Sequence, residues 1–431
     1  MKPIVFIENH YATHMYYPLA VELKSRGHNV ILIYWNAFFA KKWLNGFKCI
    51  KLKPGFENEI NEKELILEDR AFKYFKRNYK EYALSDVYVE NLLRNLNPKL
   101  ILGEPTLFYE LQIALAAKKL GYVYSYIGPS RFFRDRIVAY DGIELKYLKF
   151  ISSDIELRSS NKSSDELSLN TLLLESNRSE KIVKIIQLKD YLLSLFYSGK
   201  NIRPSIFKKL LLEIKRKALL KRIPNYSIGN NIKKNQKTTI LYPLQMQPES
   251  NSDVWGRPYS NQLENIKQLA KIENVEILVK LNPTTKYEFS QELLDFIKVS
   301  KTVNLVPVEK KMTEVLNYCD VVFSIVGTVI LECLELKKPV IVLKTDAYFT
   351  ELSGVNVVSS INKIDSNFLS NLKVATDSEW NLIIEEQRKY SVPGLIYDPL
   401  RSPNLVNNKS NNLMLTQFIL DIANYKSGRD V

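Results

Sequence analysis

The chain has 431 residues, 45% hydrophobic and 25% charged, with a formal net charge of +14. This length allows two domains with separate cores, and the hydrophobic content excludes an intrinsically disordered chain. No apolar run approaches the ~18 residues of a membrane span, and the first one, at 4–7, is too short for a signal peptide. Three unpatterned cysteines, Cys49, Cys319 and Cys333, exclude a disulfide scaffold and fit a reducing compartment, so we expect a cytoplasmic protein.

The first 150 residues alternate strand and helix patterns, which predicts a parallel sheet covered on both faces. In chain order the pattern gives a strand at 4–7, a helix at 15–25, strands at 30–34 and 100–102, a helix at 106–120 and a strand at 122–127. The turn after the first strand, Glu8 to His14, contains no glycine. A dinucleotide-binding fingerprint is therefore excluded at the position where it would occur.

The middle of the chain differs in composition. Residues 150–180 are rich in Ser, Asn and charge, which indicates an insertion or loop, and helical patterns follow to about residue 225. The polar run at 229–236 has the composition of an interdomain linker.

Residues 203–222 form a basic amphipathic segment. It contains eight Lys/Arg against one acid, Glu213, and its apolar residues recur at helical spacing. Such a helix either packs its apolar stripe on its own protein or lies on an anionic membrane surface. Nucleic-acid binding is disfavoured because no nucleic-acid module accompanies the segment.

A second strand–helix series begins at 238–242. It continues with a helix near 260–271, a strand at 275–280, a helix near 287–298 and a short loop with a strand within 337–343, and a helix near 411–425 follows in the tail. We therefore expect four parts: an α/β domain at 1–150, a helical insertion and linker at 151–237, a second α/β domain at 238–405, and a C-terminal helix at 406–431 that packs back across the linker. The fold class is α/β, with two Rossmann-like parallel-sheet domains facing each other across a cleft.

In the second domain, three loops follow predicted strands, and the carboxyl edge of a parallel sheet is where such folds bind ligands. Each loop supplies polar or charged side chains. They are Gln245, Gln247, Pro248, Glu249 and Ser250 in the first loop, Lys280, Asn282 and Pro283 in the second, and Glu309 in the third.

The fourth segment, Ser324 to Glu332, reads as the end of a strand, a tight turn and a helix. The N–H groups at a helix start form a natural phosphate seat, Gly327 allows close approach of the backbone, and Ser324 and Thr328 offer hydroxyls. Glu332, one turn into the helix, is placed to hold a ribose. By itself the segment is equally an ordinary strand-to-helix turn.

Together the segments Gln247-Pro248-Glu249-Ser250, Lys280-Leu281-Asn282-Pro283 and Ser324 to Glu332 resemble the C-terminal half of bacterial capsule-polysaccharide glycosyltransferases with a GT-B fold. The similarity is to members that use CMP-activated ulosonic acids, of which the Kdo transferases of capsule assembly are the best known. It covers roughly residues 238–345, and the N-terminal domain only by architecture. One position departs from the family: its usual histidine is Asn282 here, and an amide cannot carry a positive charge.

The resemblance implies transfer from a CMP donor with Glu249 as the catalytic carboxylate. Departure of CMP leaves an oxocarbenium-like carbon, so the phosphate needs cationic or N–H stabilisation and the sugar needs a nearby carboxylate. That carboxylate deprotonates the acceptor hydroxyl in an inverting enzyme or attacks the sugar in a retaining one. No Asp-x-Asp pair ends a strand, so we expect neither a catalytic metal nor another cofactor.

The N-terminal domain would hold the acceptor. Glu104 follows the strand at 100–102, and His10 lies in the first loop, so both are candidates for catalysis on the acceptor side; Glu104 is alternatively a helix-start acid. Contacts to the acceptor or to the donor carboxylate are expected from Asn9, His14, Ser130 and Arg131.

The sequence therefore favours a metal-independent glycosyltransferase that moves a Kdo-, sialic- or pseudaminic-acid-like sugar from CMP onto a bacterial capsule or lipopolysaccharide glycan. Its partners would be a nucleotide-sugar donor, a glycan or glycolipid acceptor and, through 203–222, the inner face of the cytoplasmic membrane. Alternatives are a CDP-glycerol or CDP-ribitol phosphotransferase of teichoic-acid type, a nucleotide-sugar epimerase, and a non-catalytic scaffold of capsule assembly. This set remains open because the same scaffold hosts many donors.

Overall fold

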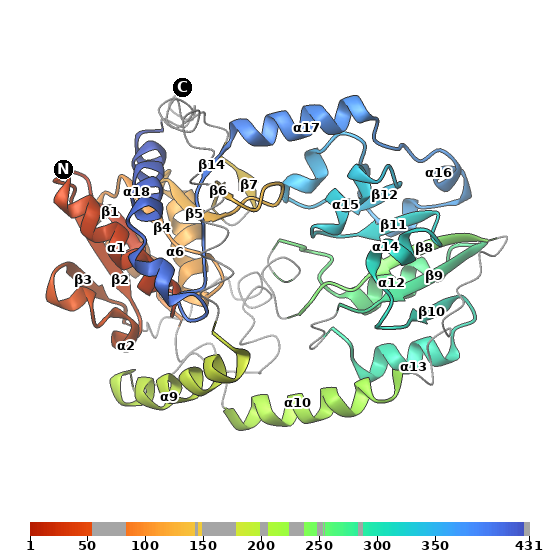
Figure 1. Ribbon diagram of the computed structural model, residues 1–431, viewed down its shortest axis with the longest axis horizontal. Helices are drawn as coiled ribbons and strands as arrows, with labels where there is room; N and C mark the ends of the chain where they lie inside the picture. Colours follow the sequence, from red (N-terminus) through yellow and green to blue (C-terminus); the bar gives the residue numbers. More distant parts are fainter. Residues whose placement is uncertain are drawn as a thin grey trace. The chain divides into compact units, whose positions relative to one another are not determined.

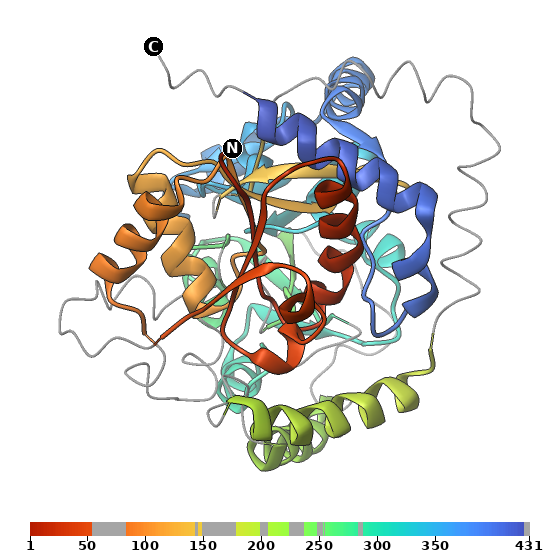
Figure 2. The ribbon, with the colours of Figure 1, turned by 90° about the vertical axis from the view of Figure 1, so that its left-hand side faces the viewer.

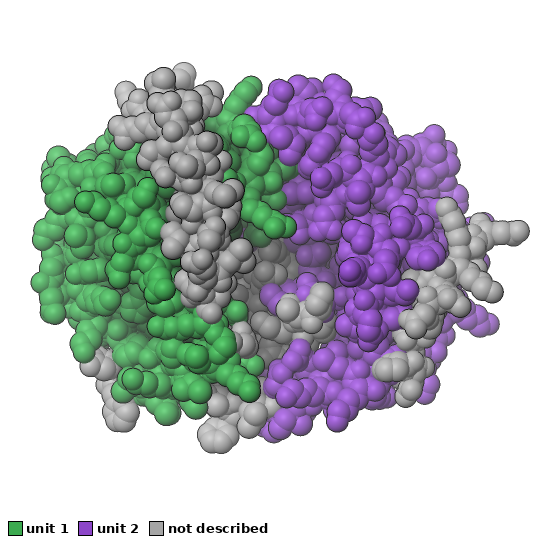
Figure 3. Space-filling model, viewed as in Figure 1, with its two compact units in different colours: residues 1–66, 77–203, 386–431 green, residues 67–76, 204–385 purple. Residues whose placement is uncertain are grey.

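The computed structural model describes residues 1–53, 83–142, 145–148, 178–198, 206–223, 237–247, 253, 255–282 and 288–425. The chain divides into two compact units, coloured separately in Figure 3. Unit 1 comprises residues 1–66, 77–203 and 386–431, and unit 2 comprises 67–76 and 204–385.

Unit 1 is built on an eight-stranded sheet. Its strands are β1 (Ile4–Ile7), β2 (Val30–Tyr34), β3 (Lys48–Lys51), β4 (Leu100–Leu102), β5 (Tyr124–Pro129), β6 (Arg136–Asp141), β7 (Lys146–Tyr147) and β14 (Ser391–Pro393). The order is β14-β6-β5-β4-β1-β2-β3, with β7 paired to β6. The five strands from β3 to β5 are parallel, and β6, β7 and β14 add antiparallel pairs. β1 therefore lies between β2 and β4, where the direction of strand addition reverses.

Helices surround this sheet. They are α1 (Ala12–Ser25), α2 (Ala37–Ala40), α5 (Asp86–Leu96), α6 (Phe108–Lys119), α9 (Glu180–Ser198) and α18 (Lys409–Asn424), with short 3-10 turns η1 (Trp43–Asn45) and η6 (Pro403–Asn407). α18 packs on α1, as Figures 1 and 2 show. Leu415, Phe418, Ile419 and Ile422 of α18 are at most 1% exposed and belong to the core of unit 1. The C-terminal helix thus belongs to the helix layer that packs on the N-terminal sheet.

Unit 2 has an entirely parallel six-stranded sheet. Its strands are β8 (Thr238–Pro243), β9 (Val275–Lys280), β10 (Val303–Val306), β11 (Val321–Ser324), β12 (Val340–Leu343) and β13 (Asn356–Val358). The order β10-β9-β8-β11-β12-β13 is the doubly wound arrangement, in which addition of strands reverses between β8 and β11. The strands from β8 to β12 are mostly buried and rich in Val, Ile and Leu, because helices cover parallel sheets on both faces.

The helices of unit 2 are α10 (Ile206–Leu220), α12 (Gln262–Leu269), α13 (Gln291–Val299), α14 (Met312–Leu316), α15 (Val329–Glu335) and α16 (Ser366–Ser370), with η4 (Tyr348–Glu351) and η5 (Ile361–Lys363). α17 (Asp377–Lys389) runs across the boundary into unit 1. No described helix is both long enough and apolar enough to cross a membrane.

The α/β class and the two parallel-sheet units agree with the sequence analysis; the expected cleft between them stays a prediction. One boundary is corrected. Residues 386–405, assigned from sequence to the second domain, belong to unit 1 because β14 pairs antiparallel with β6, with Ser391 opposite Val138. Three residues of strand give too short a pattern to reveal this return from sequence.

Candidate functional site

The topology of unit 2 places the predicted binding segments at one edge of its sheet. β8, β9, β10 and β11 are parallel neighbours, so the loops that follow them lie together at the carboxyl end. The strand order reverses between β8 and β11, and doubly wound sheets bind ligands outside the strand ends at such a point. The loops after β8 and β11 are therefore the centre of the candidate site.

Gln245 and Gly327 meet at this point. Gly327 has a φ of +112°, and a Cβ built on it would lie 2.6 Å from Oε1 of Gln245. The positive φ favours glycine, and a Cβ would fit here only if the Gln245 side chain moved away. The loop after β8 and the turn after β11, whose residues Gln245 and Gly327 are 82 positions apart in sequence, are thus in direct contact.

A network of amides fixes the loop after β8. Gln262, at the start of α12, accepts from the N–H of Gln245 at 2.7 Å and donates to its carbonyl at 2.7 Å. The amide of the buried Gln247 donates to Asp253 at 2.8 Å and to the Ser260 carbonyl at 2.9 Å. Gln247 therefore braces the loop, and its expected contact with nucleotide stays a prediction. Gln262 is not among the residues predicted from the sequence; its place at the start of the helix that follows this loop was the available signal.

Lys280 ends β9 with a buried side chain, 4% exposed. Its Nζ donates to the Val308 carbonyl at 3.2 Å, which ties the loop after β9 to the loop after β10. Burial lowers the pKa of this lysine, and the nearby Glu309 carboxylate opposes the shift. A desolvated ammonium at a strand end attracts an anion more strongly than one in water does.

The turn after β11 offers a ligand fewer polar groups than its sequence pattern predicts. The Ser324 hydroxyl is buried and donates to the Val326 carbonyl at 2.9 Å, so it shapes the turn. Thr328 is exposed and begins α15, which has only seven residues and a correspondingly weak dipole. Glu332 is half-buried, and burial raises the pKa of its carboxyl.

The remaining candidates in unit 2 divide by location. Glu309 is exposed and Asn282 half-buried. Pro248, Glu249, Ser250 and Pro283 lie outside the described residues, so their roles stay predictions.

Unit 1 has its own polar cluster at the carboxyl ends of β1 and β4. The side-chain amide of Asn9 donates to Glu110 Oε2 at 2.9 Å, to Thr106 Oγ1 at 3.2 Å and to the Glu104 carbonyl at 3.3 Å. Asn9 thereby joins the loop after β1 to the loop after β4. Burial, reinforced by the charge of Glu104, raises the pKa of the fully buried Glu110 well above its ordinary value.

Glu8 holds the first loop in place. Its carboxylate accepts from the N–H groups of His10 at 2.8 Å, Asn36 at 3.1 Å and Trp35 at 3.2 Å. Burial raises the pKa of Glu8, and these hydrogen bonds oppose the rise. His10 has a φ of +44°, a left-handed conformation that is uncommon for a residue with a side chain. Its Nδ1 lies 3.7 Å from Glu8 Oε1.

A pocket of about 420 Å³ opens beside this cluster, wholly within unit 1. Asn9, His10 and Glu104 line it together with the chain return at 396–399, and their expected role toward an acceptor stays a prediction. This return contributes Tyr397, whose buried hydroxyl has no hydrogen-bond partner within the described chain, and Asp398. Neither was predicted, because only the pairing of β14 with β6 brings them to the first loop.

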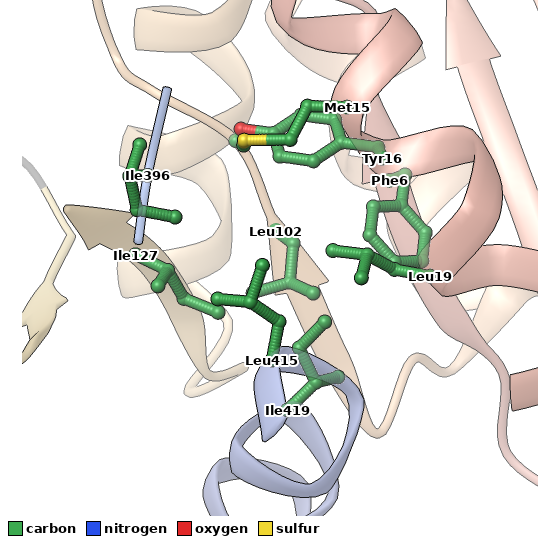
Figure 4. Close-up of a pocket in the computed structure, with 10 residues that line it drawn as sticks. Phe6, Met15, Tyr16, Leu19, Leu102, Ile127, Ile396, Leu415 and Ile419 are labelled. Atoms are coloured by element: carbon green, nitrogen blue, oxygen red, sulfur yellow. The ribbon is translucent and has the colours of Figure 1, made fainter. Parts of the chain in front are cut away.

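Beneath the polar lining the pocket has an apolar floor. Met15, Tyr16, Ile127 and Ile396 line both the pocket and a separate cavity of about 10 Å³, shown in Figure 4. Leu415 and Ile419 of α18 complete that cavity. A void this small and apolar is expected to stay empty, so the larger pocket is the binding space.

The other residues predicted for unit 1 are not among those lining this pocket. Burial lowers the pKa of His14, and its ring lies 6.2 Å from those of Tyr11 and Phe39. Ser130 accepts from the N–H groups of Phe132 and Phe133, both at 3.2 Å, which makes it a turn residue. Arg131 lies near Tyr126, a lining residue, whose pKa its charge lowers against a larger rise from burial. Ligand contacts by these three residues stay predictions.

Within the described ranges, no group of three or more His, Cys, Asp or Glu side chains is arranged to hold a metal ion.

No protein-family model and no curated protein sequence matches the chain. Solved structures that are similar to it include KpsC of Thermosulfurimonas dismutans, a beta Kdo 2,7 transferase, at 11% identity and a TM-score of 0.37, covering 96% of this chain and 99% of that one. UDP-GlcNAc 2-epimerase of Methanocaldococcus jannaschii is similar at 14% identity and a TM-score of 0.28, covering 89% and 99%. A glycosyltransferase of Rickettsia africae is similar at 12% identity and a TM-score of 0.27, covering 97% and 98%. Sequence identities and TM-scores this low support no conclusion about residue roles or activity.

Proposed function

We propose that the chain is a glycosyltransferase that transfers an ulosonic-acid-type sugar from a CMP donor to a surface glycan of a bacterium. The observation that carries the proposal is the contact of Gln245 with Gly327 at the strand-order reversal of unit 2. It joins the loop after β8 and the turn after β11, two of the segments on which the resemblance rests. The desolvated Lys280 ends the neighbouring strand β9 and supplies positive potential for a phosphate.

The chemistry needs no redox cofactor, and we propose that it needs no metal. The acceptor hydroxyl oxygen attacks the anomeric carbon, the bond from that carbon to the phosphate oxygen breaks, and CMP leaves with the electron pair. In the inverting form, Glu249 takes the hydroxyl proton. In the retaining form, its carboxylate first bonds to the anomeric carbon as CMP leaves, and the acceptor oxygen then displaces the carboxylate while the departed CMP phosphate takes the hydroxyl proton. Lys280 stabilises the negative charge on the departing phosphate. Asn282 stands where the family has a histidine, and its amide cannot carry the positive charge that would contribute to this role.

The pocket of unit 1 suits the acceptor. The carboxylates and the histidine of its lining can form hydrogen bonds with sugar hydroxyls, and Tyr126 and Tyr397 add aromatic side chains to the lining. Glu104 and His10 are the proposed acceptor-side groups. The unpartnered Tyr397 hydroxyl is a further group for the acceptor to satisfy.

The basic helix α10 is the proposed contact with an anionic membrane surface. Leu211 is 59% exposed and Ile214 is 56% exposed, so both apolar side chains face solvent. Lys215 and Lys217 on the same helix are also exposed. This combination favours an interfacial helix, which would keep the enzyme near a glycolipid acceptor.

The donor is tested by thermal unfolding with CMP, CDP, UDP, GDP and dTDP. A ligand that binds only the folded protein raises its melting temperature, and we expect a rise with CMP alone. A preference for CDP would indicate phosphopolyol transfer, a preference for another nucleotide would replace CMP as the donor, and no rise with any nucleotide would favour the scaffold. Lys280→Met keeps the length of the side chain and should abolish the CMP effect, whereas Lys298→Met, on the exposed side of α13, should not.

Catalysis is tested separately from binding. Glu249→Gln should remove transfer from a CMP-ulosonic acid while leaving the CMP-induced rise intact. If both are lost together, Glu249 binds the donor and another group must serve as the catalytic carboxylate. His10→Gln should weaken acceptor saturation without changing the response to CMP.

A further inference from the structure

Helix α9 of unit 1 presents an unusual outward face. Five of its large apolar side chains, all within residues 182–193, are at least 39% exposed: Ile182, Ile185, Leu188, Leu192 and Leu193. No other helix with described side chains carries more than two such residues. Single exposed apolar residues are normal on a protein surface, but a contiguous stripe marks an interaction site.

The opposite face explains why the stripe points outward. Val183 is 1% exposed and Ser194 is 1% exposed, and α9 lies against α2 (Figure 1). Asp190 accepts from the Tyr11 hydroxyl at 3.0 Å, so it too is on the packed face. Ile185 follows Val183 by two residues, a spacing that places side chains on opposite sides of a helix. Packing on unit 1 therefore fixes which face α9 offers to a partner.

The described charged side chains on the outward face are all positive. Lys181, Lys184 and Lys189 are exposed and lie at helical spacing beside the apolar stripe. Asp190 is the acid among the described side chains of α9, and it is engaged with Tyr11 on the packed side. An apolar stripe flanked by lysines matches a surface that is negatively charged outside and hydrocarbon beneath.

We propose that the outward face of α9 binds an anionic phospholipid bilayer, with Ile185, Leu188 and Leu192 entering the interface and the lysines contacting lipid headgroups. A second copy of the chain is the less suitable occupant, because a symmetric contact would bring lysines against lysines. The proposal goes beyond the enzymatic function and does not depend on it. It is also separate from α10, which belongs to unit 2.

The test is co-sedimentation of the full chain with phosphatidylcholine vesicles, with and without phosphatidylglycerol. We expect binding only to the anionic vesicles, weakened by salt. Each lysine near such a surface contributes about fivefold in affinity, so joint Lys181→Glu, Lys184→Glu and Lys189→Glu should weaken binding by roughly a hundredfold or more. Joint Ile185→Ser, Leu188→Ser and Leu192→Ser should do so without changing the melting temperature, because these side chains are exposed.

Matched controls separate α9 from other causes. Val299→Ser with Leu382→Ser removes exposed apolar side chains from α13 and α17 and should leave vesicle binding unchanged. Leu211→Ser with Ile214→Ser tests α10 alone. The proposal is wrong if the α9 variants bind vesicles like the parent chain, or if light scattering shows a dimer that the α9 variants dissociate while no vesicle binding occurs. CMP-induced thermal shifts on the same proteins report the proposed enzymatic function independently.

Discussion

At the scale of single residues, buried carboxyl groups organise unit 1. Glu110 is fully buried, and its Oε2 accepts from Asn9 Nδ2 and from the N–H of Leu107 at 3.2 Å. Its Oε1 has no hydrogen-bond partner among the described residues. Tyr124 has a similarly unsatisfied hydroxyl, and both atoms would lie within 3.3 Å of a Cβ built on Gly103. A protonated Glu110 fits this environment better than a carboxylate does.

Glu110 should therefore make the protein less stable as pH rises. The folded state raises the pKa of Glu110, so it retains a proton that the unfolded chain releases above its ordinary value of 4.5. The free energy of unfolding then falls above that pH, by at most about 1.4 kcal/mol per pH unit for this group. Urea unfolding between about pH 5 and pH 8 measures the slope, which Glu110→Gln should make more positive.

The glutamine variant keeps an oxygen that can accept from Asn9 and has no proton to lose. Glu110→Leu lacks the acceptor and should cost about 1–3 kcal/mol at every pH, because it leaves the donors unsatisfied. If Glu110→Gln shows the slope of the parent chain, Glu110 is ionised in the folded protein and the account of its burial is wrong.

Gly327 gives the second residue-scale prediction. Gly327→Ala should destabilise the protein by about 1–3 kcal/mol, since an alanine at this φ is strained. The new Cβ would also meet the Gln245 side chain. Adding Gln245→Ala should recover only the part due to the contact, and chemical unfolding of the single and double variants measures both parts. Gly46→Ala is the control: no atom lies within 4 Å of the Cβ it would add, and its φ is −153°.

At the scale of secondary-structure elements, the C-terminal helix α18 packs in the core that the N-terminal strands and α1 form. Its Phe418 is 1% exposed in the core formed with β1, β2 and α1. The same helix contributes Leu415 and Ile419 to the lining of the small cavity that shares residues with the pocket of unit 1. Loss of α18 packing would therefore affect both the stability and the pocket of unit 1.

Phe418→Ala should lower the free energy of unfolding by about 3–5 kcal/mol, the cost of a large cavity in a packed core. Leu420→Ala, on the half-buried side of the same helix, should cost less and serves as the control. Equal costs for the two changes would show that α18 is held by its surface contacts rather than by the core.

At the scale of the whole molecule, the proposal assigns different ligands to the two units. Hydrogen exchange on the full chain can locate each ligand without separating the units. CMP should slow exchange at 244–247 and 324–328 in unit 2, because bound ligand suppresses local opening. A glycan acceptor should slow exchange at 9–12 and 396–398 in unit 1. Protection by CMP confined to the unit 1 segments would reverse the assignment.

The sequence by itself determined the elements whose residues pattern strongly. The buried strands at 4–7, 30–34, 100–102 and 275–280 have the predicted bounds, because a run of branched apolar residues between polar turns has few other structures available. The strand–helix alternation also determined the order of polar loops at the sheet edges. Helix ends differ from the predicted bounds: the helix predicted at 106–120 spans Phe108–Lys119.

Only the tertiary structure decided which distant residues meet. The return of β14 to β6 brings Tyr397 and Asp398 to the loop that contains His10, and the close approach of Gln245 to Gly327 joins two loops of unit 2. The tertiary structure also showed that Gln247 and Ser130 form hydrogen bonds within their own loops, and that Glu8 and Glu110 are buried. Local sequence patterns reflect the preferred backbone conformation and the spacing of buried residues. These contacts depend instead on packing between segments that are far apart in the chain.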